Sequence, residues 1–289
     1  MTLAMEPTTA SPATSTELPL SDAYLRLTAA CAALDVRVLH TEPAPHPEPD
    51  GRGRLDGAEL ACSEEAMAAF VDAEAARIAA RHGHAPRRDV AASRALHDYL
   101  WSVSLLMSGP WYLERRVPRI APQDVRLVLA TAAFELVPGA DFACLPGDPA
   151  AGSPGARVVA DEEALRAELR AAVADHVRPL LTAVRPHARR GPRVLWGMAG
   201  DDLVSGIWYL GRMLGQEERA LQAATELLPT AVAPFPGGAD FRRLTTPDGR
   251  RHPTRTRIGC CMYYAVEPDQ ACATCPRTCD AERLRRLTD

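Results

Sequence analysis

The chain has 289 residues, of which 47% are hydrophobic and 24% are charged, so it is long enough to bury a substantial core and has an ordinary globular composition. No stretch approaches the roughly 18 consecutive apolar residues of a membrane span, although a peripheral membrane association would leave no such mark. The net charge of −4 disfavours nucleic acid as a partner. Residues 241–289 nevertheless carry ten arginines against six acidic residues. This basic bias would suit an acidic partner and is equally compatible with a solvated face.

The N-terminal residues are rich in Thr, Ser, Pro and Ala, with neither a basic start nor an apolar block. They do not resemble a secretory signal, so we expect residues 1–20 to form a disordered tail and the protein to be cytoplasmic. Prolines at alternate positions from Pro43 to Pro49 predict a loop over residues 42–57.

Apolar residues at helical spacing predict that most of the chain is helical. Ser63, followed by two acidic residues, is typical of a helix N-cap, and Pro110 is expected to end a helix. The predicted helices run from Ser21 toward Val36, from Ser63 through Ile78, from Val90 to Ser108, from Asp161 through Val184, from Asp201 or Asp202 through Leu214, and from Gln216 to Leu228.

Three other segments complete the expected fold. Residues 125–130 and 133–137 have the apolar density of short strands, although one buried helix would also explain them. The aromatic and arginine-rich residues 111–120 are expected to form a loop over a groove or an edge. Residues 241–246 and 252–258 predict a hairpin turned by Pro247, Asp248 and Gly249.

The predicted fold class is therefore α+β, predominantly helical with a few short strands and a C-terminal hairpin that leads into a cysteine-rich segment. Residues 21–238 are expected to form one mainly helical domain. Residues 239–289 would supply the hairpin and the cysteine-rich segment, packed on that same domain.

Five of the eight cysteines lie within twenty residues of one another near the C-terminus. Cys260 and Cys261 are adjacent, ten residues separate Cys261 from Cys272, and Cys275 completes a C-x2-C turn. Thiolates in such a cluster suit soft metals and iron–sulfur centres. Neighbouring side chains on an extended chain point to opposite faces, so the adjacent pair needs a local twist, which Gly259 could permit.

The spacing matches neither common ferredoxin pattern, and it lacks the second C-x2-C of a zinc ribbon. A two-iron cluster presents a wider target than a single ion and better tolerates an adjacent pair. Chemistry alone favours an iron–sulfur centre, with structural zinc and non-ligating cysteines as alternatives. Cys279 is interpreted as a spare thiol, with exchange as a ligand or a different metal site left open.

The motif Cys260-Cys261-Met262-Tyr263-Tyr264, followed by Cys272-Ala273-Thr274-Cys275-Pro276, resembles the C-terminal motif of the FhuF-like ferric-siderophore reductases. The segment from Leu195 to Gly206 is also similar to a helix entry of that family. The resemblance implies a [2Fe–2S] cluster held by Cys260, Cys261, Cys272 and Cys275. It also implies transfer of one electron to an Fe(III)-siderophore, so that Fe(II) is released.

Nucleotide-binding glycine motifs are absent from the sequence, so electrons are expected from a separate ferredoxin or flavin reductase. No catalytic residue beyond the cluster ligands is indicated, and His97, His176 and His252 are interpreted as surface or core residues. Three other readings remain: a zinc-stabilised binding module, an iron–sulfur sensor that regulates a partner, and a siderophore-binding protein without redox activity. The candidate siderophore contacts are Arg255, Arg257, Tyr263, Tyr264, Trp111 and Arg115, with Arg116 beside them.

Overall fold

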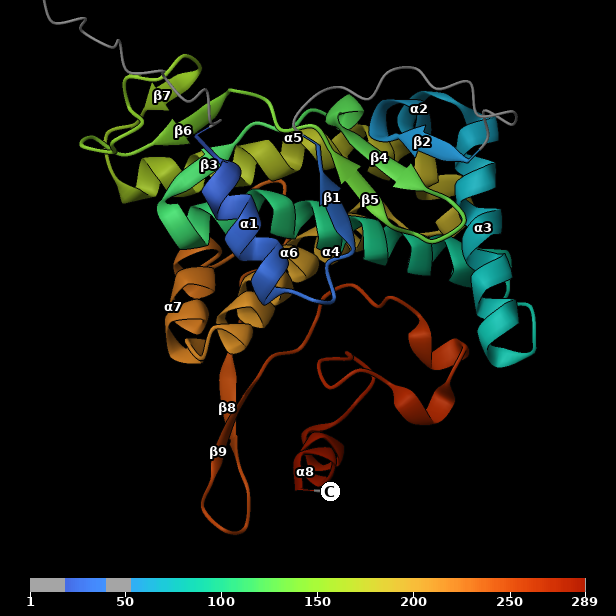
Figure 1. Cartoon of the computed structure of the whole chain (residues 1–289). Helices are drawn as coiled ribbons and strands as arrows, with labels where there is room; N and C mark the ends of the chain where they lie inside the picture. The colour runs from blue at the N-terminus through green and yellow to red at the C-terminus, as the bar shows by residue number, and fades with distance from the viewer. Residues whose placement is uncertain (1–18, 40–52, 289) are drawn as a thin grey trace, which may run out of the picture.

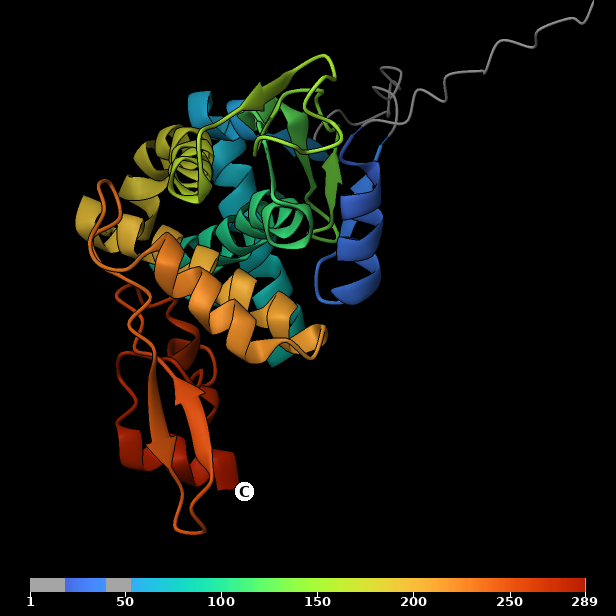
Figure 2. The ribbon, with the colours of Figure 1, turned by 90° about the vertical axis from the view of Figure 1, so that its left-hand side faces the viewer.

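A computed structural model describes residues 19–39 and 53–288 of the chain. Two small sheets lie on one side of a group of long helices, and the C-terminal segment lies on the opposite side (Figures 1 and 2). The predicted α+β class with predominantly helical character is confirmed. Residues 1–18 of the predicted tail and 42–52 of the predicted loop lie outside the described residues. Leu20, predicted to be in the tail, is buried in the core at 2% exposed, and the end of the predicted loop forms a strand over Arg54–Asp56 and the start of a helix at Gly57.

Helix α4 (Arg88–Glu114) is the centre of the core and contacts α1, α3, α5 and α6. The prediction that Pro110 ends this helix is wrong, because Pro110 lies inside it. An internal proline costs a helix roughly 3 kcal/mol. Every side chain from Ser102 to Tyr112 is buried, and this packing outweighs the cost.

The prediction of a loop at residues 111–120 is also wrong, because the packing of α4 extends the helix into this segment. Trp111 begins the last turn of α4, which ends at Arg115 in the left-handed conformation with a φ of 58°. Strand β3 (Arg116–Pro118) follows directly. The segment is therefore part of the packed fold rather than a rim over a groove.

The other helices follow the predicted periodicity, with two shifted ends. The first predicted helix ends at Ala30, and strand β1 follows. The helix predicted to begin at Asp201 or Asp202 begins at Pro192 instead, so both aspartates lie inside it. The helices are α1 (Ser21–Ala30), α2 (Gly57–Cys62), α3 (Glu64–His82), α5 (Glu162–Ala188), α6 (Pro192–Met213), α7 (Glu217–Leu227) and α8 (Asp280–Thr288).

Residues 125–130 and 133–137 do form paired strands, as predicted. They belong to a sheet in the order β1-β5-β4-β2, in which β4 is antiparallel to β5. A second sheet has the order β3-β6-β7, and the predicted C-terminal hairpin pairs β8 with β9. The remaining strands are β1 (Val36–Val38), β2 (Arg54–Asp56), β4 (Val125–Val128), β5 (Phe134–Leu136), β6 (Phe142–Cys144), β7 (Ala156–Val158), β8 (Arg242–Thr245) and β9 (Arg251–Thr254).

His176 of α5 is a buried polar residue in the core, 2% exposed. Its Nδ1–H donates to Ile120 O at 3.0 Å, and the Tyr99 hydroxyl donates to its Nε2 at 2.9 Å. This arrangement uses both ring nitrogens of the neutral imidazole. Burial lowers the pKa of His176 to about 4.

We therefore expect acid to destabilise the protein through His176. The buried neutral ring of His176 contributes its full stabilisation at pH values above the pKa of histidine in the unfolded chain, about 6.5. This stabilisation is lost as the pH falls toward 4, the pKa of His176 in the folded protein. The free energy of urea unfolding should decrease by about 2 kcal/mol between pH 7 and pH 5 from this residue. The His176→Gln variant should show a shallower pH dependence than the wild type, whereas His84→Gln, an exposed control, should not. Equal slopes for wild type and His176→Gln would contradict the assignment.

Candidate metal centre

The first cysteine pair is held directly against helix α6. A Cβ on Gly259 would lie 2.7 Å from Met198 N and 2.9 Å from Met198 Cα, and a Cβ on Gly197 would lie 2.7 Å from Ile258 Cγ2. The Gly259 N–H donates to Asp201 Oδ2 at 2.7 Å. Glycine is therefore needed at these positions because the chain and the helix approach too closely for a side chain.

The twist that the adjacent pair requires was expected at Gly259. It lies instead immediately after the pair. Met262 adopts the left-handed conformation, with a φ of 62° and a ψ of 15°. Its backbone N–H donates to Cys260 Sγ at 3.4 Å. The turn at Met262 thus redirects the chain and supplies a hydrogen bond to one of the candidate ligands.

The four predicted ligands converge as two pairs. Cys261 interacts with Cys272, and Cys260 interacts with Cys275. Cys261 and Cys275 are 4% and 2% exposed, whereas Cys260 and Cys272 are half-buried. Each pair therefore combines one buried and one partly accessible sulfur. The Cys279 thiol is exposed.

The C-x2-C turn is fixed by backbone hydrogen bonds and by helix α8. The Cys275 N–H donates to Cys272 O at 2.9 Å, and the Arg257 N–H donates to Thr274 O at 3.1 Å. Arg283 of α8, 2% exposed, donates from Nη2 to Cys275 O at 2.8 Å. The second pair of cysteines is thus tied both to the segment that precedes the first pair, through Arg257, and to the last helix.

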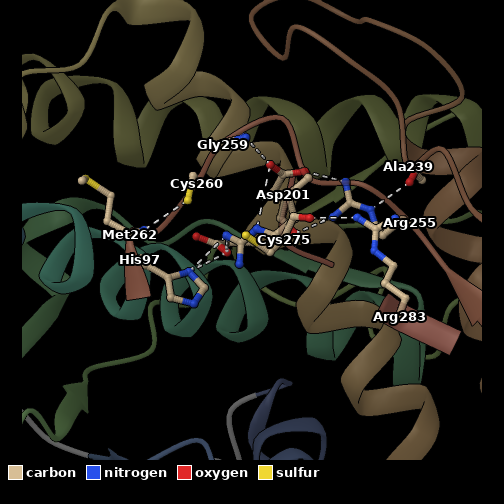
Figure 3. Close-up of polar contacts among 11 residues, drawn as sticks. His97, Asp201, Ala239, Arg255, Gly259, Cys260, Met262, Cys275 and Arg283 are labelled. Atoms are coloured by element: carbon tan, nitrogen blue, oxygen red, sulfur yellow. Dashed lines mark hydrogen bonds and ion pairs between the residues drawn. The ribbon is translucent and has the colours of Figure 1, made fainter. Parts of the chain in front are cut away.

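A buried ion-pair network connects the cysteine segment to α6 (Figure 3). Arg255 Nη2 lies 2.6 Å from Asp201 Oδ1, and Arg257 Nη2 lies 2.6 Å from Asp202 Oδ1. Asp202 Oδ1 also lies 2.8 Å from Nδ1 of His97 on α4. The two aspartates predicted as helix caps therefore neutralise two arginines from the chain just before the cysteines.

Positive charge gathers around Cys261. The interaction with Cys272 is the largest cause that lowers the pKa of Cys261 to about 4, and His97, Arg94 and Arg257 lower this pKa further. A thiolate is the form that ligates a metal. Arg94 was not predicted as a site residue, because nothing local marks a residue more than 160 positions before the cysteines.

The surroundings fit an iron–sulfur cluster. The Nε of Arg257 is buried and has no hydrogen-bond partner among the described residues, although Arg257 lies beside Cys261 and Cys272. The thiolate and sulfide sulfurs of a bound cluster would accept the hydrogen bond that this Nε–H has not formed. Within residues 19–39 and 53–288, no group of three or more His, Cys, Asp or Glu is arranged to hold a single metal ion. Two pairs of cysteines are compatible with a two-iron centre.

The structure separates the predicted siderophore contacts into two groups. Arg255 is 1% exposed and fully used by Asp201 and Ala239 O, so it cannot contact a bound chelate, and this prediction is corrected. Trp111 is 1% exposed, and Arg115 pairs with Glu162. Arg115, at the C-terminal end of α4, lies about 30 Å from Arg94 along the axis of this helix. The contact rim predicted at the end of α4, which includes Arg116, is therefore remote from the cysteines.

Two predicted contacts do lie beside the cysteine segment. The Tyr263 ring centroid lies 5.3 Å from the Arg94 guanidinium carbon, and the Tyr264 ring centroid lies 4.4 Å from that of Arg277. Both rings are half-buried. Arg257 is 6% exposed and is paired with Asp202, so it remains a candidate only at the edge of the site.

Four cysteine sulfurs, a cationic surround and an anchoring helix define an iron–sulfur protein of mainly helical fold. Residues 257–277 match the family model of the FhuF 2Fe-2S C-terminal domain. The resemblance to the FhuF-like family is thereby confirmed for this segment, which carries a [2Fe–2S] cluster. A comparison of the whole chain with curated proteins finds no match. No helix among the described residues is long and apolar enough to cross a bilayer.

We expect Arg94 to raise the reduction potential. Reduction adds a negative charge to the cluster, and removal of one nearby cation in Arg94→Gln should cost the reduced form about 1–2 kcal/mol at an effective dielectric constant near 20. The potential should therefore fall by roughly 50–100 mV in a redox titration. Arg88→Gln, in an exposed ion pair on the same helix, is the control and should leave the potential unchanged. An unchanged potential in Arg94→Gln would show that this charge does not act on the cluster.

Proposed function

We propose that the protein is a cytoplasmic one-electron reductase that reduces Fe(III) in a siderophore and thereby releases Fe(II). The observation that carries the proposal is the match of residues 257–277 to the FhuF 2Fe-2S domain on a segment whose four sulfurs are held by the rest of the fold. The cluster would be held by Cys260, Cys261, Cys272 and Cys275. When bound, it supplies a reversible one-electron store.

The residues of the chain would contribute position and charge rather than acid–base chemistry. The ion pairs from Asp201 and Asp202 would fix the segment between β9 and the first cysteine pair, because Arg255 and Arg257 lie in that segment. Arg94, His97 and Arg257 would favour the more negative, reduced state. One electron converts Fe(III) into Fe(II), and the hard oxygen ligands of a siderophore hold Fe(II) far less tightly, so the metal can leave without bond cleavage in the chelator.

The electron donor would be a separate ferredoxin or flavin reductase. The arginine-rich residues 241–289 support an acidic donor surface, and Arg277 is one exposed positive charge beside the cysteine segment. The siderophore and the donor would then approach the same C-terminal region of the molecule.

The test is a single-turnover reaction. The protein is purified without oxygen, reduced with dithionite, freed of excess reductant and mixed with a ferric trihydroxamate or a ferric triscatecholate. Reoxidation of the cluster with about one Fe(II) captured by a ferrous chelator per cluster would support the reductase. A siderophore-binding protein without redox activity would bind the chelate while its cluster stays reduced. A colourless protein that contains zinc after attempted reconstitution would exclude the proposal.

A further inference from the structure

A cavity of about 550 Å³ opens beside the cysteine segment, between helices α4 and α6. It lies within the size range of small-molecule sites. One side of the cavity is shared with the metal centre described above. His97 and Arg257 line this side, together with Thr274, which lies inside the C-x2-C turn. A molecule in this cavity would therefore lie one side chain away from the predicted ligands Cys261 and Cys272, because Arg257 both lines the cavity and approaches these cysteines.

Aromatic rings form the opposite wall of the cavity. Trp101 of α4 and Tyr209 of α6 pack edge to face with ring centroids 5.4 Å apart. The indole N–H of Trp208 donates to Glu217 Oε1 at 2.8 Å, and its ring packs edge to face on Phe241 at 5.3 Å. All three rings are half-buried. Their contacts hold them in place before a ligand arrives, which reduces the entropy lost on binding.

Two of the charged groups that line the cavity are neutralised within the protein, because Arg257 is paired with Asp202 and Asp98 lies 2.9 Å from Arg94. Asp35 also lines the cavity and is exposed. Binding would therefore depend mainly on the faces and edges of the rings, with Asp35 as an exposed negative charge at the cavity. A large chelate, whose organic ligand wraps the metal and presents apolar and π surfaces outward, matches such a wall.

We propose that this cavity, lined by Trp101, Trp208 and Tyr209, is the binding site of the ferric chelate. This inference rests on the proposed function and places the electron acceptor at the Cys261 and Cys272 side of the cluster. The bound chelate receives one electron from the reduced cluster, so Fe(III) becomes Fe(II) while the cluster returns to its oxidised state. No other reactant is needed for this step.

The test uses gallium(III) chelates, which have the size of their ferric counterparts but do not accept the electron. Gallium complexes of a linear trihydroxamate and of a triscatecholate are titrated calorimetrically into the cluster-loaded protein. We expect at least one complex to bind the wild type. Its dissociation constant should increase at least about tenfold in Trp208→Ala, which removes a ring, and in Ser205→Trp, which fills the cavity where Ser205 lines it.

Trp196→Ala is the matched control, because Trp196 lies on the same helix and also packs edge to face on a phenylalanine, but does not line the cavity. Its affinity for the gallium complex should equal that of the wild type, and all variants should keep the visible spectrum of the cluster. Unchanged affinity in both cavity variants would overturn the site. So would a wild type that binds neither gallium complex while it reduces a ferric one. Binding that depends on Trp208, in a protein that never reduces the chelate, would retain the site and refute the reductase.

Discussion

The Cys275→Ser variant is expected to lose its cluster, whereas Cys279→Ser retains it. Cys275 is 2% exposed, faces Cys260, and is fixed by hydrogen bonds from both its own N–H and Arg283. A serine hydroxyl is a hard ligand that remains protonated near neutral pH, so it cannot replace a soft thiolate. Cys279 is exposed at the start of α8.

The two variants form a matched pair, because each changes one sulfur to oxygen within the same short segment. The measurements are the visible spectrum, the iron and acid-labile sulfide bound per chain, and the electron paramagnetic resonance signal after reduction. We expect about two irons and two sulfides in the wild type and in Cys279→Ser, and a severe loss in Cys275→Ser. Full iron content in Cys275→Ser, or its loss in Cys279→Ser, would assign the fourth ligand to Cys279.

The second large effect is expected at Asp201, which supports the cysteine segment from inside α6. Its carboxylate is 1% exposed and accepts from Arg255 Nη2 at 2.6 Å and from the Gly259 N–H at 2.7 Å. The Asp201→Ala variant leaves the Arg255 guanidinium buried without its counter-ion. Breaking a buried pair in this way typically costs about 3–5 kcal/mol.

The effect should appear in both stability and metal content, because Gly259 directly precedes the first ligand pair. We expect the midpoint of urea unfolding to decrease and the iron to be lost at lower urea than in the wild type. Asp72→Asn, which breaks an exposed pair with Arg88, is the control and should cost about 1 kcal/mol or less. If Asp201→Ala and Asp72→Asn were equally stable, the buried network would not hold the segment.

Local chemistry was sufficient to predict the ligands. The spacing of Cys260, Cys261, Cys272 and Cys275 is carried by the chain itself, and the comparison with known families matched the same segment. Helix starts with a clear cap were also predictable, because Ser63 and Asp161 each accept a hydrogen bond from the first turn of the helix that follows. The hairpin before the cysteines was indicated by its turn residues in the same way.

Tertiary packing decided the elements in which a local preference was overruled. Pro110 would end an isolated helix, but α4 is buried on every side around it. The adjacent Asp201 and Asp202 are typical of a helix start in sequence, yet they lie inside α6 because Arg255 and Arg257, more than fifty residues later, neutralise them. The network was not predicted from the sequence; an unusual pair of acids inside an apolar run, with alternate arginines near the cysteines, is the signal that could have indicated it.

The sequence by itself indicated the cluster and most of the helical segments, and it predicts the four cysteines that bind the cluster, since ligand type and periodicity are local properties. Only the tertiary structure decided what surrounds the cluster. Arg94 and His97 reach Cys261 from α4, while Trp101 and Trp208 of different helices meet around one cavity. Electrostatic fields and ligand sites depend on distances in space, and those distances arise from the packing of helices that are far apart along the chain.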